Sequence, residues 1–139
     1  MLSVQRIDHT ADVGLIITAD TCENLFKAAA EEMFALICKN NSAIQEAEEI
    51  TLSVEGEDFE ELLVNWLSEL NFLFQTEQLL LAQVISLKID GNSLSAKYTA
   101  ERISAKKHHI TTEIKAVTYH NLYVRQENNI WKTEIIFDV

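Results

Sequence analysis

Two stretches with a helical hydrophobic period divide a chain whose apolar residues otherwise tend to alternate with polar ones. In residues 22–38 and 59–75 the apolar side chains recur every three or four positions, which is typical of amphipathic helices. Seven other segments have the alternation or the short apolar runs of strands. They are residues 6–18, 49–55, 80–90, 93–100, 111–118, 122–126 and the stretch from 130 to the end.

The order of these segments favours an α+β fold, with two amphipathic helices packed on a mainly antiparallel sheet. The turns Asp90-Gly91-Asn92 and Glu127-Asn128-Asn129 suit hairpins. The chain has no proline and three glycines, and we find no linker-like or repeated segment in it. A length of 139 residues with 47% hydrophobic residues is typical of one folded domain. We therefore predict a single domain over residues 1–139.

The charge balance narrows the choice of partners. Twenty-two acidic and eleven basic residues leave a net charge of -11. Such a field repels phosphate backbones and anionic membranes, so direct nucleic-acid or membrane binding is disfavoured, whereas divalent cations or a basic protein are favoured. Ordinary soluble proteins also carry such charge. Cys22 and Cys38 are about 24 Å apart in one predicted helix, too far for a disulfide, and we expect a cytoplasmic protein.

The common enzyme signatures are missing from the sequence. It contains no glycine-rich phosphate loop, no nucleophile elbow and no HExxH motif. Among the histidines, His108 and His109 follow two lysines and suit a solvated basic loop. His9 and His120 lie beside strand ends, where an imidazole can ligate a metal or orient a carboxylate. A histidine that is simply hydrogen-bonded in a turn explains the same spacing.

Carboxylates in the first and last predicted strands are the candidates for a metal site. Asp12 stands in the first strand, and Asp138 stands in the last strand just before Val139, whose α-carboxylate would add another anion. Oxygen ligands of this kind suit Ca²⁺, Mg²⁺ or Mn²⁺. Asp12 and Asp138 could share one ion if their strands are neighbours, and solvated aspartates are the alternative. Lys115, which we place on one strand face with Glu113 and Val117, is a salt-bridged surface lysine, a lysine held near these acids or one offered to a partner.

Three separated motifs together resemble the archease family. They are residues 8–14 (DHTADVG), 113–120 (EIKAVTYH) and 136–139 (IFDV), and segments 24–34 and 61–70 follow the family in order and spacing. The resemblance covers nearly the whole chain, and the combination of three motifs makes it specific.

Archeases are small α+β proteins that activate the RtcB-type RNA ligase, which joins RNA ends bearing a 2′,3′-cyclic or 3′-phosphate to a 5′-hydroxyl. The resemblance implies a non-enzymatic activator that promotes guanylylation and multiple turnover of this ligase in tRNA splicing or RNA repair, with a divalent ion held by acidic residues. The family's motif acids fall on Asp12 and Asp138, and its motif lysine falls on Lys115. His9 and Asp8 are carried over as further residues for the partner or for activation.

Asn65 departs from the family pattern, because many relatives have an acid before the tryptophan. Two other functions fit parts of the sequence. One is a metal-dependent hydrolase that uses Asp12, Asp138 and His9. The other is a chaperone-like binding module that uses Phe72, which lies off the core stripe of the second predicted helix.

Overall fold

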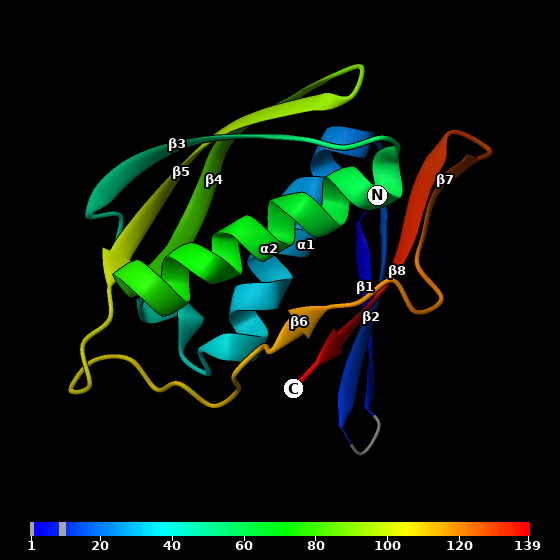
Figure 1. Ribbon diagram of the computed structural model, residues 1–139. Coiled ribbons are helices and arrows are strands. Elements are labelled where there is room, and N and C mark those ends of the chain that lie inside the picture. The colour runs from blue at the N-terminus through cyan, green and yellow to red at the C-terminus, as the bar shows by residue number, and fades with distance from the viewer. Residues whose placement is uncertain (1, 9–10) are drawn as a thin grey trace.

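The computed structural model of the chain describes residues 2–8 and 11–139 and has two helices between two antiparallel sheets (Figure 1). Helix α1 (Cys22–Ile37) contacts β4 of one sheet and β2 of the other most closely. Helix α2 (Phe59–Glu77) also contacts strands of both sheets. Each sheet therefore buries one face against the helical layer. The predicted α+β class with two helices is confirmed, and its antiparallel strands form two sheets rather than one.

The larger sheet contains both ends of the described chain. Its strand order is β1, β2, β8 and β6, and β7 pairs with β8 on the same side as β6. The strands are β1 (Ser3–Asp8), β2 (Asp12–Ala19), β6 (Ala116–Val117), β7 (Tyr123–Glu127) and β8 (Ile130–Asp138). The prediction of one strand over residues 6–18 was wrong, because the chain reverses between β1 and β2. The edge strand β1 has no continuous apolar face, so periodicity did not reveal it.

The smaller sheet has the order β3, β5, β4, and its predicted strands are confirmed to within two residues. They are β3 (Glu48–Glu55), β4 (Leu79–Asp90) and β5 (Ser93–Arg102). The turn between β4 and β5 contains Gly91 at φ 61°, a left-handed conformation that glycine adopts without strain. The helix-facing side of this sheet is apolar, and the outer face of β3 carries Thr51 and Ser53, as alternation requires.

Each of the two α-helices begins at a residue whose side chain caps it. Helix α1 (Cys22–Ile37) is capped by the Thr21 hydroxyl, which accepts a hydrogen bond from the Asn24 N–H at 3.0 Å. Helix α2 (Phe59–Glu77) is capped by Asp58, which accepts from the Glu61 N–H at 2.8 Å. Trp66 on α2 is fully buried, and its indole N–H donates to the Phe26 carbonyl of α1. No described helix combines the length and the apolar character that a bilayer span needs.

The segment from residue 111 to residue 115 is irregular, and only Ala116–Val117 pairs as a strand. The predicted strand over residues 111–118 was therefore wrong in extent. Contacts with the helices replace the missing ladder: the Thr111 N–H donates to the Ile37 carbonyl at 2.9 Å. The Ile114 carbonyl accepts from the side-chain amides of Asn71 at 2.8 Å and Gln75 at 3.0 Å.

Candidate metal centre

Asp12 and Asp138 are direct cross-strand partners. Asp12 is the first residue of β2 and Asp138 is the last residue of β8, and the antiparallel register places them opposite each other. Figure 1 shows the end of β8 beside β2. Residues paired in this way project to the same face of a sheet, with Cβ atoms about 4.5–5.5 Å apart. Two half-buried acids from opposite ends of the sequence therefore stand together.

The burial pattern of β2 and β8 determines which way these acids point. Val13 and Leu15 on β2 are 7% and 3% exposed, and their neighbours Ile135 and Phe137 on β8 are fully buried. Because successive side chains of a strand alternate between faces, Asp12 and Asp138 project to the side away from the helices.

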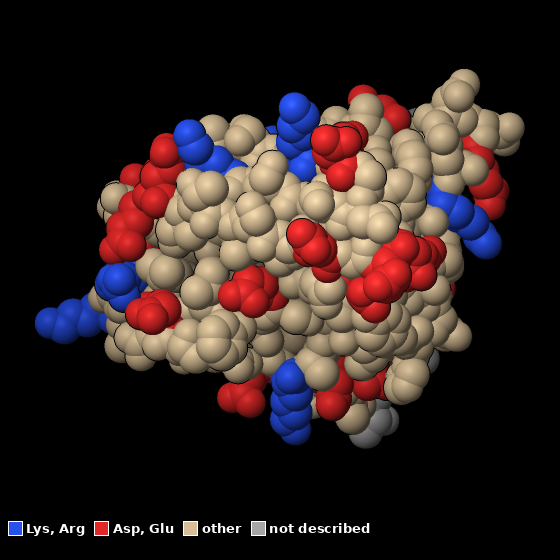
Figure 2. Space-filling model, turned by 45° about the horizontal axis from the view of Figure 1, so that its top comes forward, with Lys and Arg blue, Asp and Glu red and all other residues tan. Residues whose placement is uncertain are grey.

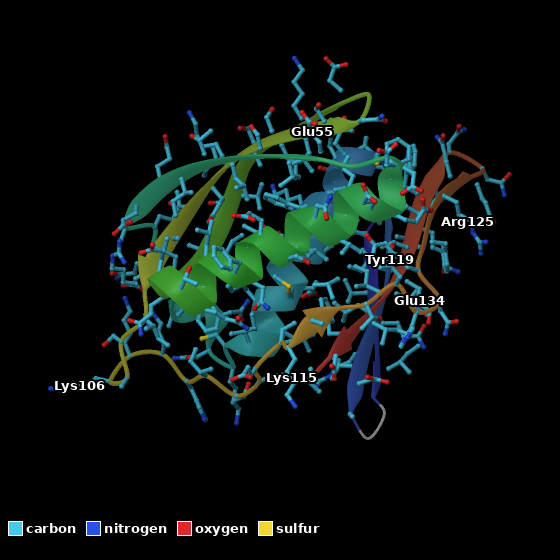
Figure 3. All side chains as sticks on the ribbon, viewed as in Figure 1. Glu55, Lys106, Lys115, Tyr119, Arg125 and Glu134 are labelled. Carbon is cyan, nitrogen blue, oxygen red and sulfur yellow. The ribbon has the colours of Figure 1, made fainter. Side chains whose placement is uncertain are left out.

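Lys115 lies next to Asp138 through the main chain. The Lys115 N–H donates to the Asp138 carbonyl at 2.8 Å, and the following residue, Ala116, pairs with Asp138. The side chain of Lys115 is exposed and extends away from the body of the fold (Figure 3). Val117 is buried, so the prediction that Lys115 and Val117 share one strand face was wrong. Lys115 stands outside β6, where strand alternation does not apply.

Of the other residues predicted for the site, Val139 lies near the acid pair. The Val139 N–H donates to the Ala11 carbonyl at 3.1 Å, which places Val139 beside the start of β2. His9 and the side chain of Asp8 lie outside the described residues. His120 is exposed, and its N–H donates to the Thr118 hydroxyl at 3.2 Å, as a histidine in a turn would.

The donor set of the acid pair fits a hard cation. None of the ion pairs among the described residues involves Asp12, Asp138 or Lys115. Two unpaired carboxylates on one face concentrate negative potential, and oxygen donors suit Ca²⁺, Mg²⁺ or Mn²⁺. In residues 2–8 and 11–139 no three side chains of His, Cys, Asp or Glu form a metal-binding group. The pair would thus supply only part of a shell of about six ligands.

Comparison with known proteins identifies the same family as the three sequence motifs that contain these residues. A model of the archease protein family matches residues 5–139. The chain belongs to the archease family. It is 36% identical over 138 residues to the archease of Methanopyrus kandleri, with 97% of this chain and 98% of that protein covered. It is also 34% identical over 140 residues to the archease of Pyrococcus furiosus, with 97% of each protein covered.

Two solved structures share the fold. The solution structure of protein 1598 from Methanobacterium thermoautotrophicum superposes with a TM-score of 0.81 at 29% identity and covers 98% of both chains. The crystal structure of an archease from Thermotoga maritima, described as a possible chaperone, has a TM-score of 0.60 at 25% identity. It covers 97% of this chain and 96% of that one. The family resemblance and the fold class predicted from the sequence are thereby confirmed.

Asn65, the departure from the family pattern, has a structural role in this chain. Its side-chain amide donates to the Glu55 carbonyl at 2.7 Å and so ties α2 to the end of β3. A carboxylate could not donate this hydrogen bond. Asn65 belongs to the part of α2 that faces the smaller sheet, whereas Asp12 and Asp138 belong to the larger one.

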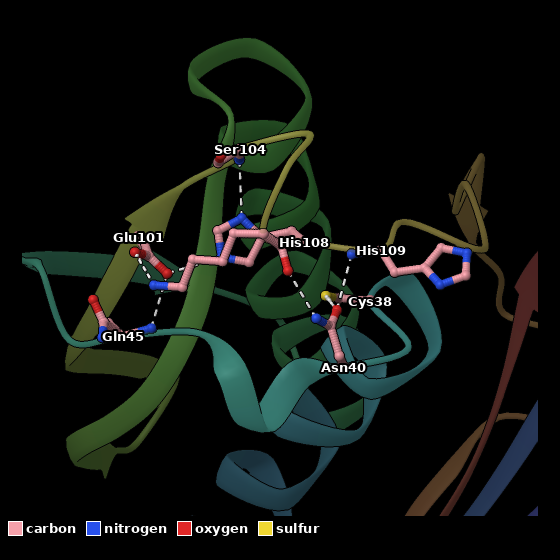
Figure 4. Close-up of polar contacts among 8 residues, drawn as sticks. Cys38, Asn40, Gln45, Glu101, Ser104, His108 and His109 are labelled. Carbon is pink, nitrogen blue, oxygen red and sulfur yellow. Dashed lines mark hydrogen bonds and ion pairs between the residues drawn. The ribbon is translucent and has the colours of Figure 1, made fainter.

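A second polar cluster surrounds His108, which we had expected in a solvated loop. That expectation was wrong, because His108 is only 4% exposed. Its Nδ1 accepts from the Ser104 N–H at 2.9 Å, and its Nε2 lies 2.8 Å from the Glu101 carboxylate (Figure 4). Because Nδ1 accepts, the proton is on Nε2 and points to Glu101. Lys107 binds the other oxygen of Glu101 at 2.7 Å.

The Glu101 cluster is bound to the rest of the fold on several sides. The Gln45 N–H, then Lys107 and His108, hold the pKa of Glu101 at about 2, below its usual 4.5. The side chain of Asn40, just after α1, donates to the Lys107 carbonyl at 2.8 Å and accepts from the His109 N–H at 2.9 Å (Figure 4). Hydrophobic periodicity carries no signal for this cluster. The Lys-Lys-His-His run indicated this segment, but as a loop exposed to solvent and not as a buried cluster.

The two cysteines, Cys22 and Cys38, are buried and free, in agreement with the prediction that they do not form a disulfide with each other. Burial, and secondarily Glu23, raise the pKa of Cys22 to about 12. Cys38 donates its S–H to the side chain of Asn40 at 3.3 Å. Neither thiol has the exposed, electropositive setting of a reactive cysteine.

Proposed function

We propose that this protein is a non-enzymatic activator of an RtcB-type RNA ligase, which promotes guanylylation and multiple turnover of that ligase in tRNA splicing or RNA repair in the cytoplasm. Family membership supports the class of function. The observation that carries the proposal is the cross-strand pairing of Asp12 with Asp138, beside the segment that carries Lys115. These are the residues on which the motif acids and the motif lysine of the family fall.

In this proposal Asp12 and Asp138 hold a divalent ion, either calcium, manganese or magnesium. A bound ion would supply positive charge at an exposed edge of an otherwise acidic protein. The chain's own contribution is positional: the β2–β8 register holds both carboxylates on one face, and Lys115 is held beside them by its N–H bond to the Asp138 carbonyl. The exposed Lys115 ammonium is available to an anionic group of the partner.

A purified ligase assay tests the proposal directly. The ligase is incubated with GTP and a divalent ion, with and without this protein, and both the rate of guanylylation and the number of RNA joining cycles are measured. We expect both quantities to rise when the protein is added. A ligase that guanylylates and turns over equally well without it would sink the proposal. RNA joining or hydrolysis by this protein alone would contradict its non-enzymatic character.

A further inference from the structure

Phe72 is a large apolar side chain that the fold leaves in solvent. It is 55% exposed on α2, although its neighbour in sequence, Asn71, is buried. A single exposed apolar residue is common on protein surfaces and needs no explanation by itself. Phe72, however, stands between two depressions of the surface, and one of them reaches Lys115.

The first depression, of about 260 Å³, lies between α2 and the start of β6. Phe72, Asn71 and Gln75 line it from the helix, and Lys115 with Ala116–Val117 lines it from the other side. The Lys115 N–H donates to the Asp138 carbonyl, so this depression lies beside the end of β8.

Asn71 adds an unpaired polar atom to this depression. Its side chain is 6% exposed, and its amide nitrogen donates to the Ile114 carbonyl. Its Oδ1 is buried and has no hydrogen-bond partner among the described residues. An unpaired buried acceptor is unfavourable, so a donor that reaches it would be stabilised.

The second depression, of about 520 Å³, lies on the other side of Phe72 and has the opposite charge. Glu55 and Glu69 are part of its lining. Figure 3 shows Lys115 and Glu55 on opposite sides of α2. The surface is thus cationic on one side of the aromatic ring and anionic on the other. Figure 2, which brings the top of this view forward, shows acidic side chains spread among uncharged ones.

We propose that Phe72 and its two flanking depressions, here called the Phe72 surface, dock a segment of the partner ligase in which an apolar side chain lies between an acidic and a basic residue. The acidic residue of the segment meets Lys115, the apolar side chain packs on Phe72, and the basic residue meets Glu55 and Glu69. The net charge of -11 and the two glutamates disfavour RNA as the occupant. This inference rests on the proposed function, because it assumes the ligase as the partner.

The dissociation constant of the purified complex tests the Phe72 surface. Phe72→Ala should weaken ligase binding about tenfold, as truncation of an aromatic anchor does. Lys115→Ala should weaken it less. Activation by Phe72→Ala should reach the wild-type maximum only at higher protein concentration, because docking is impaired and the acid pair is intact. Phe72→Tyr, which keeps the ring, should bind nearly as well as the wild type.

Two matched variants serve as controls. Ile85 is 48% exposed on β4 and lines neither depression, so Ile85→Ala should leave the dissociation constant within about twofold. Lys106, an exposed lysine earlier in the segment that leads to Lys115, is the control for Lys115→Ala (Figure 3). Thermal unfolding of every variant confirms that the fold is unchanged.

The outcomes separate this inference from the proposed function. If the wild type activates the ligase and Phe72→Ala binds as tightly as the wild type, the Phe72 surface is overturned while the proposed function stands. If the wild type neither binds nor activates the ligase, the proposed function fails first. A Phe72→Ala defect confined to RNA binding, to self-association or to ligase-independent suppression of aggregation would also overturn the inference.

Discussion

Two clusters of charged residues, one around Glu101 and one around Asp12 and Asp138, have similar chemistry and opposite surroundings. The Glu101 carboxylate binds Lys107 and the buried His108, and it also accepts from a backbone N–H (Figure 4). Asp12 faces another acid across the sheet, and neither Asp12 nor Asp138 forms an ion pair among the described residues. The first cluster is complete within the chain, whereas the two facing acids of the second have no cationic partner among the described residues.

Carboxylates therefore have different roles in the two clusters. Partners on every side make the Glu101 cluster a stable connection between β5, the end of α1 and the loop that follows β5. Like charges directly opposite in an antiparallel pair destabilise a sheet. The fold retains the Asp12–Asp138 repulsion because the core residues next to these acids hold the register.

The largest effect should come from Asp138. Asp138→Ala should reduce ligase activation about 100-fold or more, because it removes a direct ligand of the proposed ion, and even indirect partners of a metal contribute about 10- to 100-fold. Glu134, on the same face of β8 and paired with Ile16, is the matched control, and Glu134→Ala should activate normally (Figure 3). Equal loss of activation in both variants would show that general acidity, and not the acid pair, is required.

His108→Ala should destabilise the fold by roughly 1–3 kcal/mol, because it leaves the Ser104 N–H without its acceptor and removes one of the two hydrogen bonds to Oε1 of Glu101. Denaturant unfolding measures this change. The matched control is His109→Ala, since the side chain of His109 is exposed. Wild-type stability in His108→Ala would mean that the Glu101 cluster contributes nothing to folding.

Acid should weaken the Glu101 cluster over a defined range of pH. The pKa of Glu101 is about 2 in the fold and 4.5 ordinarily. A carboxyl whose folded pKa is lowered contributes stability above its unfolded pKa and loses it as the pH falls toward the folded one. The free energy of unfolding should therefore fall between pH 4.5 and 2, and less steeply in Glu101→Gln than in the wild type. Identical slopes in the two proteins would contradict the role given to Glu101.

The smallest effect should be a gain of stability at the acid pair. Asp12→Asn removes one of two facing charges, and relief of such a cross-strand repulsion is worth roughly 0.2–1 kcal/mol. Added Ca²⁺ should stabilise the wild type and leave Asp12→Asn unchanged, because ligand binding raises stability only where the site exists. Differential scanning calorimetry with and without Ca²⁺ measures both effects. A loss of stability in Asp12→Asn would show that the pair has a structural role.

The sequence predicted the helices and most strands because these elements are specified by local patterns. The turn at Gly91 is such a local signal and has the predicted role, and the helix caps at Thr21 and Asp58 also lie next to the elements they begin. The errors occur where a distant contact decides the backbone. Asn71 and Gln75 bind the Ile114 carbonyl and leave only Ala116–Val117 as a strand. The reversal before Asp12 was missed because the edge strand β1 is not periodic.

The candidate site divides in the same way. The sequence by itself identified Asp12, Asp138 and Lys115 as candidates, since their motifs and strand positions are local features of the chain. Only the tertiary structure decided that Asp12 faces Asp138, because strand order depends on how the whole chain packs and not on any one segment. It also buried His108 beside Glu101 and left Phe72 in solvent, because burial depends on which elements pack around a residue.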